Sequence, residues 1–198
     1  MKTVHFLATV ALTVSLVSCS TIRGSEDVDQ GRQALLEGHY HRALGLFQNA
    51  EQIDPTYVYG AELRGGVLSY LGRTQYLTGN YAQARDTLTK AVAEHRSDNV
   101  ARLYLGLTLY RLGDEKAGLT NIQRGMQGIY DWLEYMNTNF ALDFGKEWDT
   151  SGTIRSGIKK DLALISSANI SWPQLVADTE NLGLGIEQEE NYFRTQRS

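Results

Sequence analysis

Few residues of this 198-residue chain have the type and spacing that catalysis or metal binding requires. Cys19 is the only cysteine, so neither an intrachain disulfide nor a cysteine-based metal site can form. His39 and His41 are close in sequence, but residues two apart on a helix diverge by about 200° and do not converge on one metal ion. No Gly-x-Ser-x-Gly sequence, Walker loop or paired-histidine zinc helix is present. We therefore expect no enzyme: no catalytic residue, no cofactor-binding residue and no metal site.

Three carboxylates near the C-terminus are the next candidates for chemistry. Glu187, Glu189 and Glu190 lie close together, and paired carboxylates act as general acid and base in many enzymes. No pattern around them indicates an enclosing pocket. We therefore interpret them as a solvated helical face.

The position of Cys19 indicates a different use for this residue. Lys2 gives a positive start, residues 4–17 are mostly apolar, and the small Ser18 precedes the cysteine, which is the layout of an export signal. The apolar run of about 14 residues is shorter than the roughly 20 that a membrane-spanning helix needs. We predict that residues 1–18 are a signal peptide and that they are removed.

The sequence Leu16-Val17-Ser18-Cys19 resembles the lipobox of bacterial lipoproteins. This resemblance implies a diacylglyceryl thioether on Cys19, cleavage before it, and acylation of the new amino terminus, for example by palmitate. Several acyl chains anchor a protein firmly, because each buried methylene contributes about 0.8 kcal/mol. Ser20 stands where an Asp would signal retention in the inner membrane, so we expect the outer membrane, facing the periplasm. The alternative is an ordinary secretory signal with an incidental cysteine.

A glycine pattern recurs beyond a polar segment, residues 19–29, which we expect to be the acylated cysteine and its tether. Leu71-Gly72 with Gly79 returns 34 residues later as Leu105-Gly106 with Gly113. An earlier copy has Gly31 and Gly38, 41 residues before the second, so about seven extra residues near 57–64 must form a longer helix or a bulging loop. In each copy the second glycine is expected to end one helix in a left-handed cap.

These offsets resemble those of tetratricopeptide repeats over residues 24–126. The second copy matches best, with Leu71-Gly72, Gly79-Asn80-Tyr81, Ala84, Leu88 and Ala91, while the third has Glu115, Gly118 and Gly125 at positions where Tyr and two Ala are usual. The resemblance implies an all-α fold: a TPR-like α-solenoid of about three helical hairpins over residues 30–126. One hairpin cannot cover its own apolar face, so neighbours must stack and the ends must be capped.

In tetratricopeptide proteins the first helix of each repeat lines a concave groove. Carrying these offsets over points to lining residues from all three copies, and arginine beside tyrosine suits a peptide with acidic side chains or a free carboxylate. The predicted partner-binding residues are Arg32, Leu35, Arg73, Tyr76, Leu107, Tyr110 and Arg111, with Val28, Ser69 and Leu103 at further lining offsets.

The C-terminal third, residues 127–198, departs from the repeat pattern. Apolar residues from Ile122 to Phe140 recur at steps of four and three, which predicts that the last repeat helix runs on as one rod ending near Asn139. A helix is predicted over residues 150–167, and Ser171-Trp172-Pro173-Gln174 predicts the start of a final one. The segment holds all three tryptophans, so we expect it to dock on the repeats. It acts either as a plain C-terminal cap or as a helix that occupies the groove and competes with a partner.

The expected fold and the expected location in the cell envelope together favour a binding function. We expect a lipid-anchored, non-enzymatic scaffold or adaptor that holds a protein or peptide partner in the cell envelope, in the manner of repeat lipoproteins that help to assemble outer-membrane complexes. The net charge of -4 without a basic block argues against nucleic acid. Oligomeric state is left open. The alternative is an envelope enzyme or accessory subunit in which Trp148, Asp149 and Arg155 form a small-molecule or glycan site.

Overall fold

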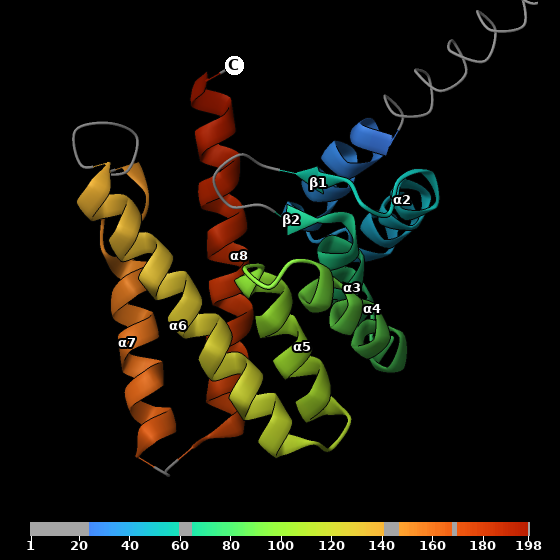
Figure 1. Ribbon diagram of the computed structural model, residues 1–198. Helices are drawn as coiled ribbons and strands as arrows, with labels where there is room; N and C mark the ends of the chain where they lie inside the picture. The colour runs from blue at the N-terminus through green and yellow to red at the C-terminus, as the bar shows by residue number, and fades with distance from the viewer. Residues whose placement is uncertain (1–23, 60–64, 141–146, 168–169, 198) are drawn as a thin grey trace, which may run out of the picture.

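The computed structural model describes residues 24–59, 65–140, 147–167 and 170–197, which form eight helices and one short two-stranded ladder (Figure 1). The predicted signal peptide and Cys19 lie outside these residues. None of the helices within the described ranges is long and apolar enough to cross a bilayer. The predicted all-α architecture is confirmed.

Three helical hairpins form the first part of the fold. Residues 24–36 precede α2 (Tyr40–Ile53), α3 (Val67–Leu77) precedes α4 (Tyr81–Glu94), and α5 (Asn99–Arg111) precedes α6 (Glu115–Asn139). Each hairpin packs on the next through α2 with α3 and α4 with α5 (Figure 1). The hairpins therefore stack side by side, as a solenoid requires.

The turn inside each hairpin has the same geometry. Gly79 has a φ of 80°, and its neighbour Asn80 donates its backbone N–H to the carbonyl of Gln75 at 2.8 Å. Gly38 and Gly113 have φ angles of 76° and 89° and stand in equivalent turns. Only glycine adopts this left-handed conformation without strain, so the predicted glycine caps are confirmed.

Within each hairpin a glycine on the first helix faces a large side chain on the second. A Cβ on Gly72 would lie 2.5 Å from Leu88 Cγ, one on Gly31 2.8 Å from Phe47, and one on Gly106 2.7 Å from Ile122. The large residue thus packs in the space that the glycine of its own hairpin leaves. In the third hairpin, Gly118 adds a backbone approach, since its Cβ would lie 2.9 Å from the Gly106 carbonyl oxygen.

Two glycine-to-alanine substitutions should have opposite effects on stability. In Gly106→Ala the new methyl would meet the Gly118 carbonyl oxygen and the Ile122 backbone nitrogen at 2.7 Å each, so α5 and α6 must move apart, at a cost of about 1–3 kcal/mol. In Gly157→Ala the methyl meets open space within a helix, so we expect a gain of about 0.5–1 kcal/mol. Urea unfolding followed by circular dichroism measures both. Equal effects of the two changes would contradict the close approach of α5 to α6.

Of the extra residues expected near 57–64, those that the structure describes are not helical, so the insertion does not lengthen the first helix of the second hairpin; residues 60–64 lie outside the described ranges. α3 begins only at Val67, and two antiparallel strands, β1 (Val58–Tyr59) and β2 (Gly65–Gly66), pair with Val58 opposite Gly66. The sequence did not predict this ladder. It places Tyr59 in the core of the first hairpin, where the ring meets Tyr70 edge-on at 6.3 Å between centroids.

One boundary at the N-terminal side differs from the prediction. Residues 24–36 are helical, although a polar tether is predicted over residues 19–29. Val28 is fully buried in the core of the first hairpin together with Leu35 and Phe47. The tether prediction is therefore wrong for residues 24–29.

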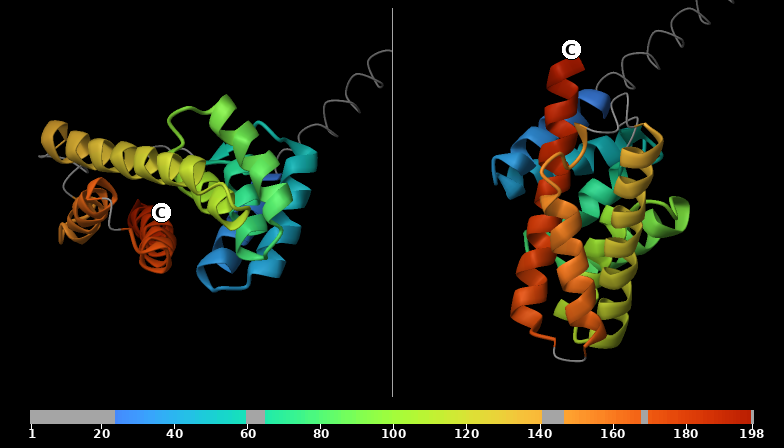
Figure 2. Two further views of the ribbon diagram at one scale, coloured as in Figure 1. Left: turned by 90° about the horizontal axis from the view of Figure 1, so that it is seen from below. Right: turned by 90° about the vertical axis from the view of Figure 1, so that its left-hand side faces the viewer.

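The C-terminal third consists of long helices, as predicted. α6 is 25 residues long and ends at Asn139, so the prediction of a continuous rod is confirmed. α7 (Thr153–Ser166) packs on α6, and α8 (Trp172–Arg197) packs on α7 and α5. Figure 1 and Figure 2 show α8 with α7 on one side and the stacked hairpins on the other.

Candidate functional site

α8 crosses the first helices of all three hairpins in reverse order. Its first residue, Trp172, stacks on Tyr110 of α5, with ring centroids 4.1 Å apart. Near its end, Arg194 contacts Asp29 of the first hairpin at 2.8 Å. A 26-residue helix is about 39 Å long, which is enough to span the three units. One helix of the C-terminal segment therefore lies on the surface on which partner residues were predicted.

Glu187 is the centre of the contact between α8 and the groove. Arg32 donates its Nε–H to Glu187 Oε1 at 2.6 Å, and Arg73 donates from Nη1 to Oε2 at 3.0 Å. Both arginines are 2% exposed and Glu187 is 4% exposed. Charge-assisted hydrogen bonds of this kind are strong, and a buried carboxylate without partners would be very unfavourable. One carboxylate thus joins α8 to the first helices of two hairpins.

Aromatic rings enclose the two guanidinium groups. Arg32 Cζ lies 4.1 Å from the centroid of Tyr59, and Arg73 Cζ lies 5.0 Å from that of Tyr104. Ring faces attract cations, so these contacts add to the ion pair. Burial, and then the charge of Glu187, raise the pKa of the nearby Tyr70 hydroxyl well above its usual value. Tyr70 therefore stays neutral beside the charged cluster.

A second polar contact lies two turns earlier on α8. The Tyr76 hydroxyl donates to Glu180 Oε1 at 2.6 Å, and Arg111 Nη2 lies 3.8 Å from the same oxygen. Burial and the hydrogen bond to Glu180 raise the pKa of Tyr76, so its hydroxyl remains a donor. The Arg111 side chain is 40% exposed, which places this contact at the solvent-facing rim of the groove.

Between the two carboxylates the backbone of α8 comes close to the groove. A Cβ on Gly183 would lie 2.7 Å from the ring of Tyr104, and Arg73 Nη2 donates to the Gly183 carbonyl at 3.2 Å. The space left beside Arg73 and Glu187 is a cavity of about 30 Å³, lined also by Ser69 and Asp98. This volume holds about one or two water molecules, so α8 fills the groove.

The seven predicted partner residues fall into two classes. Arg32, Arg73, Tyr76, Tyr110 and Arg111 all contact α8. Leu35 and Leu107 are buried in the two hydrophobic cores. The repeat offsets thus find the polar side of the groove. They do not separate lining leucines from core leucines, since both lie on the inner side of the same helices.

The interpretation of the C-terminal acids as a solvated face is wrong for two of them. Glu187 and Glu190 are buried, and only Glu189 is partly exposed. A usable signal was present: Glu180, Gly183 and Glu187 stand at steps of three and four, which places them on one face of a helix. Sequence reasoning grouped the acids by adjacency and missed this face.

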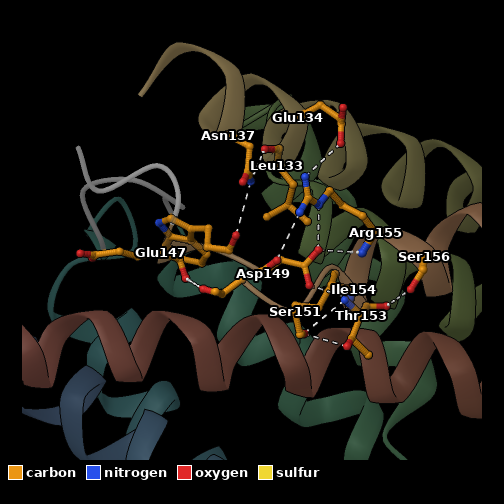
Figure 3. A network of polar contacts seen from close by, with 12 residues as sticks. Leu133, Glu134, Asn137, Glu147, Asp149, Ser151, Thr153, Ile154, Arg155 and Ser156 are labelled. Carbon is orange, nitrogen blue, oxygen red and sulfur yellow. Dashed lines mark hydrogen bonds and ion pairs between the residues drawn. The ribbon is translucent and has the colours of Figure 1, made fainter. Parts of the chain in front are cut away.

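The residues of the alternative glycan site have structural contacts instead (Figure 3). Trp148 is 0% exposed and stacks on Phe193 of α8 at 4.4 Å, so neither face of its ring is open to a sugar. Asp149 accepts from the backbone N–H groups of Ile154 and Arg155 and from Arg155 Nε, at 2.8–3.0 Å. Arg155 also contacts Glu134 of α6 at 3.2 Å. This network fixes the start of α7 against α6.

α7 packs on the other side of α8, and two carboxyl groups lie close together at this contact. Asp161 of α7 is buried beside Asp178 of α8, and Lys160 lies 3.8 Å from Asp178 Oδ2. Burial, together with the neighbouring Asp178, raises the pKa of Asp161 to about 6. Two adjacent carboxylates cannot both ionise without repulsion.

This pair predicts a pH dependence of stability. Because the pKa of Asp161 is higher in the folded state than in the unfolded state, its contribution is complete below about pH 4 and is lost as the pH rises through about 6. We expect Asp161→Asn to be more stable than the wild type at pH 8, by about 1–2 kcal/mol, and no more stable at pH 4. Urea unfolding at both pH values measures the difference. A difference that does not change with pH would show that the two carboxyl groups are not coupled.

Among the described residues, no group of three or more histidine, cysteine, aspartate or glutamate side chains is arranged to hold a metal ion. The groove contacts α8 through charges, hydrogen bonds and stacked rings. Comparison with protein families agrees with this geometry. The tetratricopeptide repeat model matches residues 34–106, which cover most of the first hairpin, the second hairpin and the start of α5. A search of curated proteins found no significant match.

Proposed function

We propose, starting from the tetratricopeptide repeats in this chain, that it is a non-enzymatic scaffold or adaptor, tied to a membrane through lipidated Cys19, which holds a protein or peptide partner in the cell envelope. Tetratricopeptide repeats generally mediate interactions between proteins. Assembly of an outer-membrane complex is a process that fits a lipid-anchored protein in the cell envelope. The repeat match and the order of residues around Cys19 support this proposal.

One observation carries the binding part of the proposal. The inner surface of the stack presents Arg32, Arg73 and Arg111 beside tyrosines, and it holds a helix through two of that helix's carboxylates. A surface built to hold one acidic helix has the groups needed to recognise another. The buried parts of this surface are charged, so they specify a partner more than they add to stability.

Photo-cross-linking in native membranes tests for the partner. p-Benzoylphenylalanine in place of Arg111, at the exposed rim of the groove, should give a discrete adduct with one protein. The matched control places it at Tyr135, which is 55% exposed and lies on α6, the second helix of its hairpin. An adduct at Tyr135 with none at Arg111 would move the interface away from the repeats. Arg73→Glu is no clean test, because the new carboxylate would be buried beside Glu187.

Metabolic labelling tests the anchor separately. An alkyne fatty acid should label the wild-type protein and leave Cys19→Ala unlabelled, and the variant should move from the membrane to the soluble fraction. A second variant, Ser20→Asp, tests sorting, since it should shift the protein to the inner membrane. A wild-type protein that takes up no fatty acid would exclude the lipid anchor.

A further inference from the structure

The central part of the α8 face that meets the groove is polar. Apolar residues of α8, among them Leu175, Val176 and Ile186, join the large hydrophobic core. Between Trp172, which stacks on Tyr110, and Arg194, which pairs with Asp29, the polar contacts to the first helices come from Glu180, Gly183 and Glu187. A helix that served only to cover the stack would bury apolar side chains there, because repeat ends are capped by apolar packing below a polar outer face.

The groove is complementary to that polar face at each position. Glu180 contacts Tyr76 and Arg111. Gly183 lies against the ring of Tyr104. Glu187 accepts hydrogen bonds from Arg32 and Arg73. The two carboxylates are seven residues apart, which is two helical turns, or about 10 Å along the axis. In α8 the groove thus holds a helix with a carboxylate at position i, a small residue at i+3 and a carboxylate at i+7.

The outer ion pairs of α8 are weak in comparison with the central one. The pair of Arg194 with Asp29 is about half exposed on both sides, and that of Arg111 with Glu180 is more than a third exposed. Exposed ion pairs contribute roughly 0–1 kcal/mol. Among the ion pairs of α8, the buried ones of Glu187 are therefore the strongest, and an acidic helix with an equivalent carboxylate would meet the same donors.

We propose that α8 is a built-in pseudo-ligand: the partner of the groove is an amphipathic helix with the carboxylate–small–carboxylate spacing, and it binds by displacing α8. This inference rests on the proposed function, since it names the chemistry of the partner and the regulation of the same site. When a partner displaces α8, the groove loses its contacts with α8 and forms equivalent contacts with the partner. A substitution that weakens the contacts of α8 should therefore raise the affinity of the groove for a partner.

The test uses the full chain and a fluorescein-labelled synthetic peptide of residues 172–197 as the probe. In fluorescence anisotropy, the full-length variant Glu180→Gln/Glu187→Gln should bind this peptide about 10-fold or more tightly than the wild type, because its own α8 competes less. Glu189→Gln is the matched control, since Glu189 lies on the same helix but interacts with Asp149 before α7, and it should bind as the wild type does. A peptide with Gln at positions 180 and 187 should lose binding about 10-fold or more.

Two further measurements test the displacement of α8 even if the double variant folds poorly. Glu180→Gln alone removes only rim contacts and should still tighten peptide binding about 3-fold. In the wild type, saturating peptide should speed hydrogen exchange of the amides in α8 around Gly183. Peptide binding that leaves α8 protected, or equal affinity for all variants, would overturn the inference. The peptide experiments need no cellular partner, so they test the displacement of α8 alone. Cross-linking at Arg111 in native membranes tests the proposed function separately.

Discussion

Replacing Glu187 by alanine is expected to lower the free energy of unfolding by about 3–5 kcal/mol. The substitution leaves Arg32 and Arg73 buried under α8 without their carboxylate. A buried charge whose partner is removed keeps its desolvation cost and loses the attraction that offset it. Both guanidinium groups keep a contact with an aromatic ring, which offsets only part of this loss.

Equilibrium urea unfolding, followed by far-ultraviolet circular dichroism, measures this effect. Glu187→Gln should lie between alanine and the wild type, since an amide oxygen accepts hydrogen bonds but carries no charge. Glu189→Ala, on the partly exposed side of the same helix, should change stability by about 1 kcal/mol or less. A Glu187→Ala protein as stable as the Glu189→Ala control would show that α8 is not held through this carboxylate.

Trp148→Ala is the other substitution with a large expected effect, a loss of about 3–5 kcal/mol. The ring is fully buried, stacks on Phe193 of α8 and meets Trp132 of α6 edge-on at 4.8 Å. Its removal would leave a cavity where the loop before α7 joins α6 and α8. Part of the surrounding structure can relax into that space, which sets the lower limit of the loss.

The control for this substitution is Tyr135→Ala. Tyr135 is also a large aromatic residue of the C-terminal third, but it is 55% exposed, and we expect its loss to cost about 1 kcal/mol or less. Thermal unfolding by circular dichroism compares the two. If Trp148→Ala unfolded at the wild-type temperature, the loop would not be part of the core.

The local parts of the fold were predictable because glycine spacing determines them. Gly79 ends a helix in a conformation open to few other residues, and Gly72 stands where Leu88 needs space. The long α6 followed from the four-and-three spacing of residues such as Met126 and Leu133. In each case residues close in sequence determine the outcome, so one sequence contains the information.

The contacts of α8 were harder to predict because they join distant residues. Arg32 and Glu187 are 155 positions apart, and either one alone is most simply interpreted as a solvated charge. The groove arginines were found from repeat offsets, yet the same offsets also pointed to Leu35, which is a core residue. The β1–β2 ladder has two residues on each strand, too few to produce an alternating pattern.

The pairing of Arg32 with Glu187 closes the chain from its first hairpin to its last helix. In an open array of repeats each unit meets only its neighbours, so units can be lost from an end one at a time. Here, unfolding of the first hairpin also removes Arg32, the counter-ion of Glu187 in α8. The first hairpin and α8 are therefore expected to unfold together in one cooperative transition. A contact between residues so far apart in sequence slows folding. The first hairpin cannot form its ion pair with Glu187 until nearly the whole polypeptide has been made.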